Sequence, residues 1–240
     1  MIITCVTARY LPNLRYLARL CEVDRVVVLD LAPLPHQYKN SFISRNRISD
    51  KSGCKLWLSV PVLRKGVRYM SEAKIDGTHH NWIDKHINSI RHAYPRHEEV
   101  AGDFVKQLRN ILLSCNGSLM DLNLQTTFLI IKVLQLDNGK LLMQSTIIGS
   151  HSKEHRMEAA KALGATGYLA GRVESGVMEK DGCIEKMASE GIDVLVSPEL
   201  APLVFPADMV ENLSAVHAIC TVGPEKTRKL VDDMVACLRG

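Results

Sequence analysis

The sequence predicts an α/β protein with a mainly parallel sheet, on the basis of three observations. Residues 2–6 and 26–30 are short apolar runs, typical of strands buried on both faces. Between them, Leu14, Leu17 and Leu20 recur at helical spacing. Strand, helix and strand in this order form a βαβ unit with parallel strands. The 240 residues, 46% hydrophobic and 23% charged, are enough to bury a large core.

The later elements continue this alternation after a long interruption. A proline-bearing loop over residues 32–55 precedes a third predicted strand at 56–62. Residues 81–136 are largely helical, and we interpret them as a helical insert or subdomain of a single domain spanning 1–240. The alternation then resumes, with strands predicted at 141–148, 167–170 and 192–196 and helices at 153–163, 184–189, 209–220 and 225–238. Asn13 is placed to cap the first helix, and Gly164 and Gly191 to end two later ones.

Composition argues against several classes of protein. Thirty Lys and Arg against 26 Asp and Glu give a net charge of +4, spread along the chain, and only 5% of residues are aromatic, so nucleic-acid binding is not favoured. No apolar run reaches the length of a membrane span, and the first residues lack the charged region of a secretory signal. Seven cysteines without a CxxC pair predict buried thiols in a reducing compartment. We therefore expect a cytoplasmic protein.

Ligands of open parallel sheets bind beyond the carboxyl ends of the strands. Residues 7–13, 30–48 and 171–181 are predicted to be loops there. Asp30 closes an apolar run, where a carboxylate can meet a metal, a ribose hydroxyl or a substrate amine, or can cap the next turn. The glycines around Tyr168 and Ser175 allow close backbone approach to a ligand, or only end helices and turns, because neither the dinucleotide nor the P-loop order is present.

Arg45 and Arg47 flank Asn46 and are the strongest binding candidates by residue type. In an extended segment both side chains face the same side, and two planar guanidiniums suit capture of a phosphate or carboxylate. The run lies between Phe42 and Ile48, which favours this function over a solvated loop.

The helical stretch is rich in histidine but does not predict a metal site. Metal ligands on a helix need two histidines at i and i+4 and a third ligand. We find no such set among His79, His80, His86, His92 and His97. No GxSxG motif is present, so nucleophilic catalysis is not favoured either.

Several short motifs occur in a recognisable order along nearly the whole chain. They are Tyr10-Leu11-Pro12, Leu29-Asp30, Arg45-Asn46-Arg47-Ile48, Trp57-Leu58-Ser59-Val60-Pro61-Val62, Trp82 with Lys85-His86 and Tyr94, Gly164-Ala165-x-x-Tyr168-x-x-Gly171, Ser175-Gly176 and Leu213-Ser214. Together they resemble the WbqC-like protein family, bacterial proteins often encoded among genes for O-antigen, other polysaccharide or natural-product biosynthesis. The set is much more specific than any one motif.

Three departures from the family pattern bear on activity. Val6-Thr7-Ala8 stands where the family has His-Gln-Pro, Leu31 replaces a second aspartate, and His217 stands in place of an aspartate after Leu213-Ser214. If the missing side chains carry the family's chemistry, this chain is a diverged member with altered or lost activity.

The resemblance implies a Rossmann-like sheet with a helical insert and a biosynthetic enzyme of the transferase or amide-ligase type. The implied substrate is activated and phosphate-bearing: a nucleotide, a nucleotide sugar or an acyl carrier. A non-catalytic binding or scaffolding relative is the alternative, so enzymatic activity is left open. A nucleotide is the one cofactor this interpretation suggests, and no metal is expected.

The candidate site residues follow from these arguments. The catalytic candidates are Asp30, to accept a proton or position a nucleophile, and Asn46, to orient the substrate. The substrate-binding candidates are Tyr10, Arg45, Arg47, Trp57, Lys85, His86, Tyr168 and Ser175. The expected partner is a small anionic metabolite or carrier-bound substrate, with a second copy of the chain or a partner enzyme as a macromolecular partner.

Overall fold

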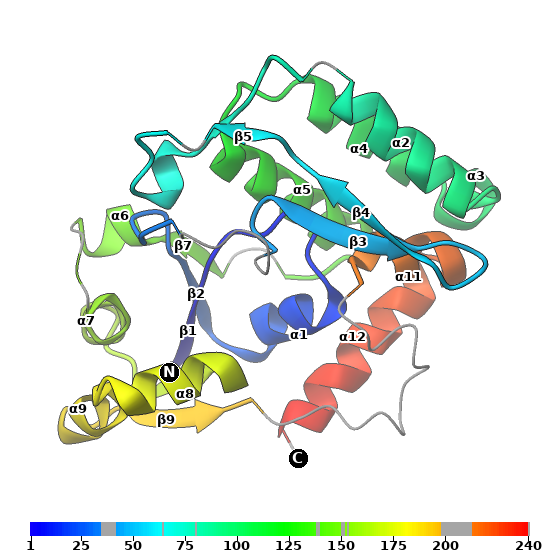
Figure 1. The fold of residues 1–240 in the computed structure, drawn as a ribbon. Helices are drawn as coiled ribbons and strands as arrows, with labels where there is room; N and C mark the ends of the chain where they lie inside the picture. Colours follow the sequence, from blue (N-terminus) through cyan, green and yellow to red (C-terminus); the bar gives the residue numbers. More distant parts are fainter. Residues whose placement is uncertain are drawn as a thin grey trace.

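Five parallel strands form the central sheet of the computed structural model. Figure 1 shows how the helices surround it. The structure describes residues 1–34, 42–63, 65–79, 81–137, 140–149, 152, 154–197 and 213–239. The strands are β1 (Ile2–Val6), β2 (Arg25–Val28), β7 (Leu141–Met143), β8 (Gly167–Ala170) and β9 (Asp193–Val196). They lie in the order β7-β2-β1-β8-β9, and every pairing is parallel. This is a Rossmann-like α/β architecture, so the predicted fold class is confirmed.

The middle of the sheet is buried on both faces, as the apolar runs predict. Cys5 of β1 pairs in register with Val27 of β2, and both side chains are buried. Thr4, the polar residue of β1, donates its hydroxyl to the carbonyl of Leu169 at 2.7 Å, which satisfies it inside the core. Because the chain runs from β1 to β2 on one side and returns to β8 on the other, the strand order reverses between β1 and β8.

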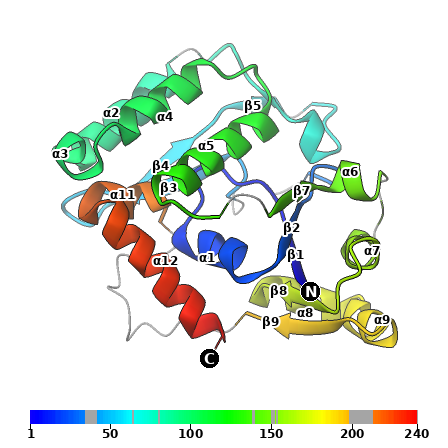
Figure 2. The same ribbon diagram turned by 180° about the vertical axis from the view of Figure 1, so that it is seen from behind.

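Helices cover both faces of this sheet. Figures 1 and 2 place α1 (Leu14–Glu22) and α12 (Pro224–Arg239) on one side of β1 and β2, and α7 (His155–Ala162) on the other. Asn13 caps α1 as predicted, accepting a hydrogen bond from the Tyr16 amide at 2.9 Å. The remaining helices near the sheet are α6 (Gln144–Ile147), α8 (Arg172–Lys180) and α9 (Cys183–Ser189), whereas α11 (Ala215–Val222) lies beside α12.

A second layer lies over the carboxyl end of β1 in Figure 1. It contains an antiparallel ribbon of β3 (Arg45–Ser49) and β4 (Lys55–Ser59), and a shorter pair of β5 (Val62–Leu63) and β6 (Lys74–Ile75) joined through a 3-10 turn at Met70–Glu72. Four helices complete the layer: α2 (Trp82–Ala93), α3 (His97–Ala101), α4 (Phe104–Leu113) and α5 (Leu119–Val133).

Three predicted elements differ in the structure. The strand predicted at 141–148 is a strand only to Met143, because the Asp30 carboxylate accepts a hydrogen bond from the Ser145 amide and caps α6 there. The segment 56–62 does not join the parallel sheet. Its first part pairs instead with residues 45–49, which form a strand and not the predicted loop. Residues 171–181 are mostly helix α8 rather than loop, because Glu174 accepts a hydrogen bond from the Gly171 amide and caps this helix.

The predictions for the helix at 209–220 and for the cysteines also differ from the structure. The helix predicted at 209–220 begins at Ala215, after Ser214 accepts a hydrogen bond from the Val216 amide at 3.2 Å, and residues 209–212 lie outside the described part. Of the seven free cysteines, Cys54 and Cys237 are exposed, so the expectation of uniformly buried thiols is wrong for these two. No helix within the described residues is long and apolar enough to cross a bilayer.

Candidate functional site

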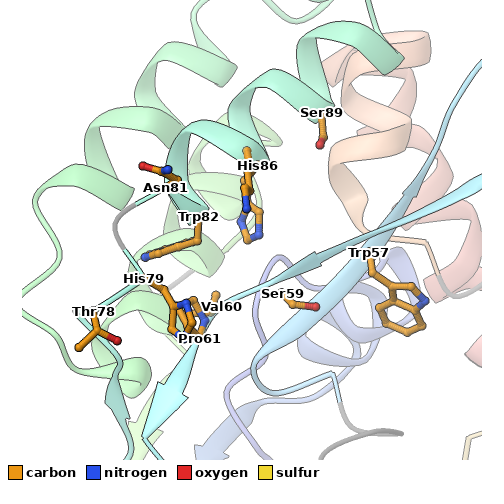
Figure 3. A pocket seen from close by; sticks show the side chains of 11 residues that line it. Trp57, Ser59, Val60, Pro61, Thr78, His79, Asn81, Trp82, His86 and Ser89 are labelled. Carbon is orange, nitrogen blue, oxygen red and sulfur yellow. The ribbon is translucent and has the colours of Figure 1, made fainter.

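A cavity of about 820 Å³ opens between β4 and α2 and collects three of the predicted site residues. Trp57, Lys85 and His86 line it, together with Ser59 and Trp82. Figure 3 shows that the lining side chains come from β4, from the turn before α2 and from α2 itself. We call this the ribbon cavity.

The two faces of the ribbon have different environments. Arg45 lies opposite Ser59, and Arg47 opposite Trp57, which places these four side chains on one face. The other face carries Asn46, Ile48 and Leu58, all buried. Alternation along β3 and β4 therefore turns the arginine pair toward the side from which Trp57 and Ser59 line the cavity.

Both guanidiniums lie over the indole of Trp57. The Cζ atoms of Arg45 and Arg47 are 4.1 and 5.6 Å from the ring centroid, and the indole is 45% exposed. Phe42 stacks beside the same indole, with a centroid distance of 6.3 Å and an interplanar angle of 28°. The Nε of Arg45 is buried and finds no hydrogen-bond partner among the described residues. Two like charges on one aromatic face are an arrangement that a bound anion would stabilise.

His86 lies at the buried wall of the cavity. Its Nδ1 is 2.9 Å from the Tyr10 hydroxyl, and Trp82 contacts the imidazole edge-on at 5.1 Å between centroids. Burial lowers the pKa of His86 to about 4, while a hydrogen bond with the Ser59 backbone opposes the shift. Burial also raises the pKa of Tyr10. Both side chains are therefore neutral near pH 7, and the protonated Tyr10 hydroxyl holds the His86 ring in place through their hydrogen bond.

The predicted catalytic residues lie outside the lining of this cavity. Asp30 is buried at the end of β2, and its Oδ1 accepts a hydrogen bond from the Ser145 amide at 3.0 Å. Asn46 donates its side-chain amide to the carbonyls of Tyr10 and Leu11, at 3.3 and 2.6 Å. This contact fixes the loop after β1 onto the ribbon. Catalytic roles for Asp30 and Asn46 stay predictions.

Tyr168 and Ser175 belong to a different part of the molecule. The Tyr168 hydroxyl donates to Glu174 at 2.7 Å, and Ser175, on α8, donates to the Arg172 carbonyl at 2.9 Å. Both lie next to the carboxyl end of β8 and not in the ribbon cavity. Their assignment to substrate binding also stays a prediction.

Sequence reasoning missed some lining residues for different reasons. Ser59 follows Trp57 by two positions within the predicted strand at 56–62, so the alternation of that strand already places both on one face. Thr78 and His79, from the turn before α2, also line the cavity, and no local pattern connects them with β4. The arginines at the carboxyl edge of the sheet come from two separate segments, 9–19 and 156–172, which no local pattern connects.

Comparison with known proteins gives a family but no individual relative. A search of curated proteins and a search of solved structures each found no match. A family model, that of the WbqC-like proteins, matches residues 8–229, which covers both the ribbon cavity and most of the parallel sheet. The chain belongs to the WbqC-like protein family.

Proposed function

We propose that this chain is a biosynthetic enzyme of the transferase or amide-ligase type that acts on a phosphate-bearing activated substrate, such as a nucleotide, a nucleotide sugar or an acyl carrier. One observation carries the proposal: Arg45 and Arg47 share a ribbon face over the exposed Trp57, which lines the ribbon cavity. Membership in the WbqC-like family supports a biosynthetic setting.

The residues around the ribbon cavity are suited to bind such a substrate. Guanidinium groups bind phosphate oxygens with two parallel hydrogen bonds, so Arg45 and Arg47 would hold the anionic part. The exposed indole of Trp57 offers a flat surface for a ring next to that anion. Lys85 adds a third cation from α2, and a volume of about 820 Å³ is typical of small-molecule sites.

In the proposed reaction, an amine nitrogen or hydroxyl oxygen attacks the activated carbon of the substrate. The bond between that carbon and the phosphate-bearing leaving group breaks, and its electron pair stays on the oxygen or sulfur of that leaving group. The nucleophile's proton passes to a carboxylate, for which Asp30 is the predicted acceptor, or to water. Arg45 and Arg47 would stabilise the negative charge that grows on the leaving group.

Calorimetric titration with UDP-glucose, ADP and coenzyme A tests the binding part of this proposal. We expect at least one of the three to bind, and Arg45→Gln or Arg47→Gln to weaken it about tenfold or more, the worth of one hydrogen bond to a charged group. Arg91→Gln, an exposed substitution on α2, is the matched control and should leave affinity unchanged. The proposal fails if none of the three binds, or if both ribbon variants bind as the wild type does.

A non-catalytic binding relative is the second candidate, and one observation favours it. Val6 and Ala8 are buried apolar side chains where the family pattern has His-Gln-Pro. To separate the candidates, the bound compound is incubated with amine and hydroxyl acceptors and followed by mass spectrometry. Release of the phosphate-bearing group that Asp30→Asn reduces supports the enzyme. Retention of intact ligand at full affinity supports the binding relative.

A further inference from the structure

A second cavity lies at the point where the strand order of the parallel sheet reverses. Its volume is about 510 Å³, and Thr7, Gly171 and Ser197, which follow β1, β8 and β9, all line it. Open α/β sheets bind their ligands at this switch point, because the loops on either side diverge there. The cavity shares no lining residue with the ribbon cavity. We call it the switch-point cavity.

The lining of the switch-point cavity is strongly basic. Among the described residues, Glu174 is the only carboxylate of the lining, whereas five of the lining residues are arginines: Arg9, Arg15, Arg19, Arg156 and Arg172. Two helices also begin at this cavity, α1 after its cap Asn13 and α8 after Gly171. Helix N-termini carry partial positive charge and therefore add to the same field.

Glu174 compensates only part of this charge. Its two oxygens accept from Arg19 at 2.6 Å, Arg156 at 2.8 Å, the Tyr168 hydroxyl at 2.7 Å and the Gly171 amide at 3.2 Å. The carboxylate is therefore saturated, and its contacts hold Arg19 and Arg156 rigidly in the wall.

Arg9 and Arg15 make no ion pair with any carboxylate of the described residues. The guanidinium of Arg9 instead lies over the ring of Tyr16, with its Cζ 5.2 Å from the ring centroid. Burial lowers the pKa of Arg9, with Tyr16 opposing and the nearby charge of Arg19 adding to the shift. An anion in the cavity would compensate these two charges.

We propose that the switch-point cavity binds the phosphate or diphosphate group of a metabolite, with Arg9 and Arg15 as its direct ligands. Planar guanidiniums and two helix N-termini, in a lining whose one carboxylate among the described residues is already saturated, together select a multiply charged oxyanion over a carboxylate or a neutral group. The site is additional to the ribbon cavity, so the chain can hold two anionic groups at once.

Calorimetry on the full chain with inorganic phosphate, pyrophosphate, ADP and glucose 1-phosphate tests the site, with adenosine as the phosphate-free probe. We expect pyrophosphate to bind and Arg9→Gln or Arg15→Gln to weaken it about tenfold or more. Arg91→Gln should leave pyrophosphate affinity within twofold. Tighter binding of ADP than of pyrophosphate would show that the bound metabolite is a nucleotide. Tighter binding of glucose 1-phosphate than of phosphate would show that it is a sugar phosphate.

Three results would overturn the assignment: no binding of any phosphate probe, equal affinity for adenosine and ADP, or pyrophosphate binding unchanged in the switch-point variants. Loss of pyrophosphate binding only in the Arg45→Gln/Arg47→Gln variant would place the anion in the ribbon cavity and refute this site without refuting the proposed function. If Arg9→Gln does not fold, Arg15→Gln decides the outcome, because Arg15 is exposed.

Discussion

Two tyrosine–histidine pairs are buried inside the fold. Tyr10 pairs with His86 at 2.9 Å, and Tyr94 pairs with His217 at 2.8 Å, each through the histidine Nδ1. Burial raises the pKa of both tyrosines, so both hydroxyls remain protonated in these hydrogen bonds. His217 therefore has a structural partner inside the fold.

Tyr10→Phe should lower the free energy of unfolding by about 1–3 kcal/mol, because it leaves a buried imidazole nitrogen without its partner. Urea denaturation followed by circular dichroism measures the change. Phe128→Leu, at an exposed aromatic of α5, is a control that should change stability by less than about 0.5 kcal/mol. Unchanged stability in Tyr10→Phe would show that the pair contributes nothing to the fold.

His86 should also make the fold sensitive to acid. Its folded pKa is about 4, below the unfolded value of 6.5, so the unfolded chain binds more protons between these values. Stability should therefore fall as pH drops from 6.5 to 4, by about 3 kcal/mol from this residue. Burial also lowers the pKa of His155, which acts in the same direction.

Unfolding titrations at several pH values measure this dependence. His86→Gln should flatten the slope between pH 6.5 and 4 by up to one proton, whereas the exposed His92→Gln should keep the wild-type slope. Identical slopes for the wild type and His86→Gln would exclude His86 as the group responsible.

The ribbon shows how one element can serve both packing and binding. Alternation gives β3 and β4 a buried face and an outward face, and the arginine pair lies on the outward face only because the register sets it there. A slip of one residue would bury Arg45 and Arg47 and expose Ile48. The register therefore controls the candidate site as much as the residue types do.

Leu58→Ala should destabilise the fold by about 2–5 kcal/mol, because Leu58 is 1% exposed and its removal leaves a cavity under the ribbon. Leu56→Ala on the same face, at a side chain 36% exposed, should cost much less. Thermal unfolding of both variants gives the comparison. Equal losses would mean that the ribbon is not anchored through Leu58.

The cap of α1 has a similar local test. Asn13→Ala removes the acceptor for the Tyr16 amide and should cost about 1 kcal/mol of stability. Asn110→Ala, at an exposed position within α4, should be neutral or slightly stabilising, since alanine favours helix. Chemical denaturation distinguishes the two, and a neutral Asn13→Ala would argue against the cap.

Across the whole molecule, Glu174 connects three elements of the parallel sheet layer. It binds Arg19 of α1, Arg156 of α7 and Tyr168 of β8, so a single carboxylate holds helices from both faces of the sheet. Burial alone would raise the pKa of Glu174, but Arg19, Tyr168 and Arg156 outweigh it and lower the pKa. Its contribution to stability is therefore present above the ordinary pKa of a glutamate and is lost in acid.

Glu174→Gln should lower the free energy of unfolding by about 3 kcal/mol near neutral pH, because it leaves two half-buried arginines without their counter-charge. Glu179→Gln, exposed on the same helix, is the control and should be nearly neutral. Denaturation at pH 7 and pH 3 tests the prediction, since the difference between wild type and Glu174→Gln should shrink in acid. A difference that is the same at both pH values would contradict it.

Features that depend on neighbouring residues can be predicted from the amino-acid sequence alone. The strands at 2–6 and 167–170 have the predicted bounds, Asn13 caps the first helix, and the spacing of Arg45 and Arg47 anticipated a shared side. Apolar runs, caps and extended i, i+2 spacing act over a few residues, so they can be recognised in a linear sequence.

The end of β7, the ribbon and the switch-point cavity depend instead on contacts between distant parts of the chain. The end of β7 depends on a cap from Asp30, more than a hundred residues earlier in the chain, and the ribbon depends on pairing between two segments that the sequence alone left apart. The switch-point cavity exists only because β1 pairs with β8, which brings the arginines of α1 next to Arg156 and the start of α8. Long-range pairing creates that charge density, and no short-range pattern encodes it.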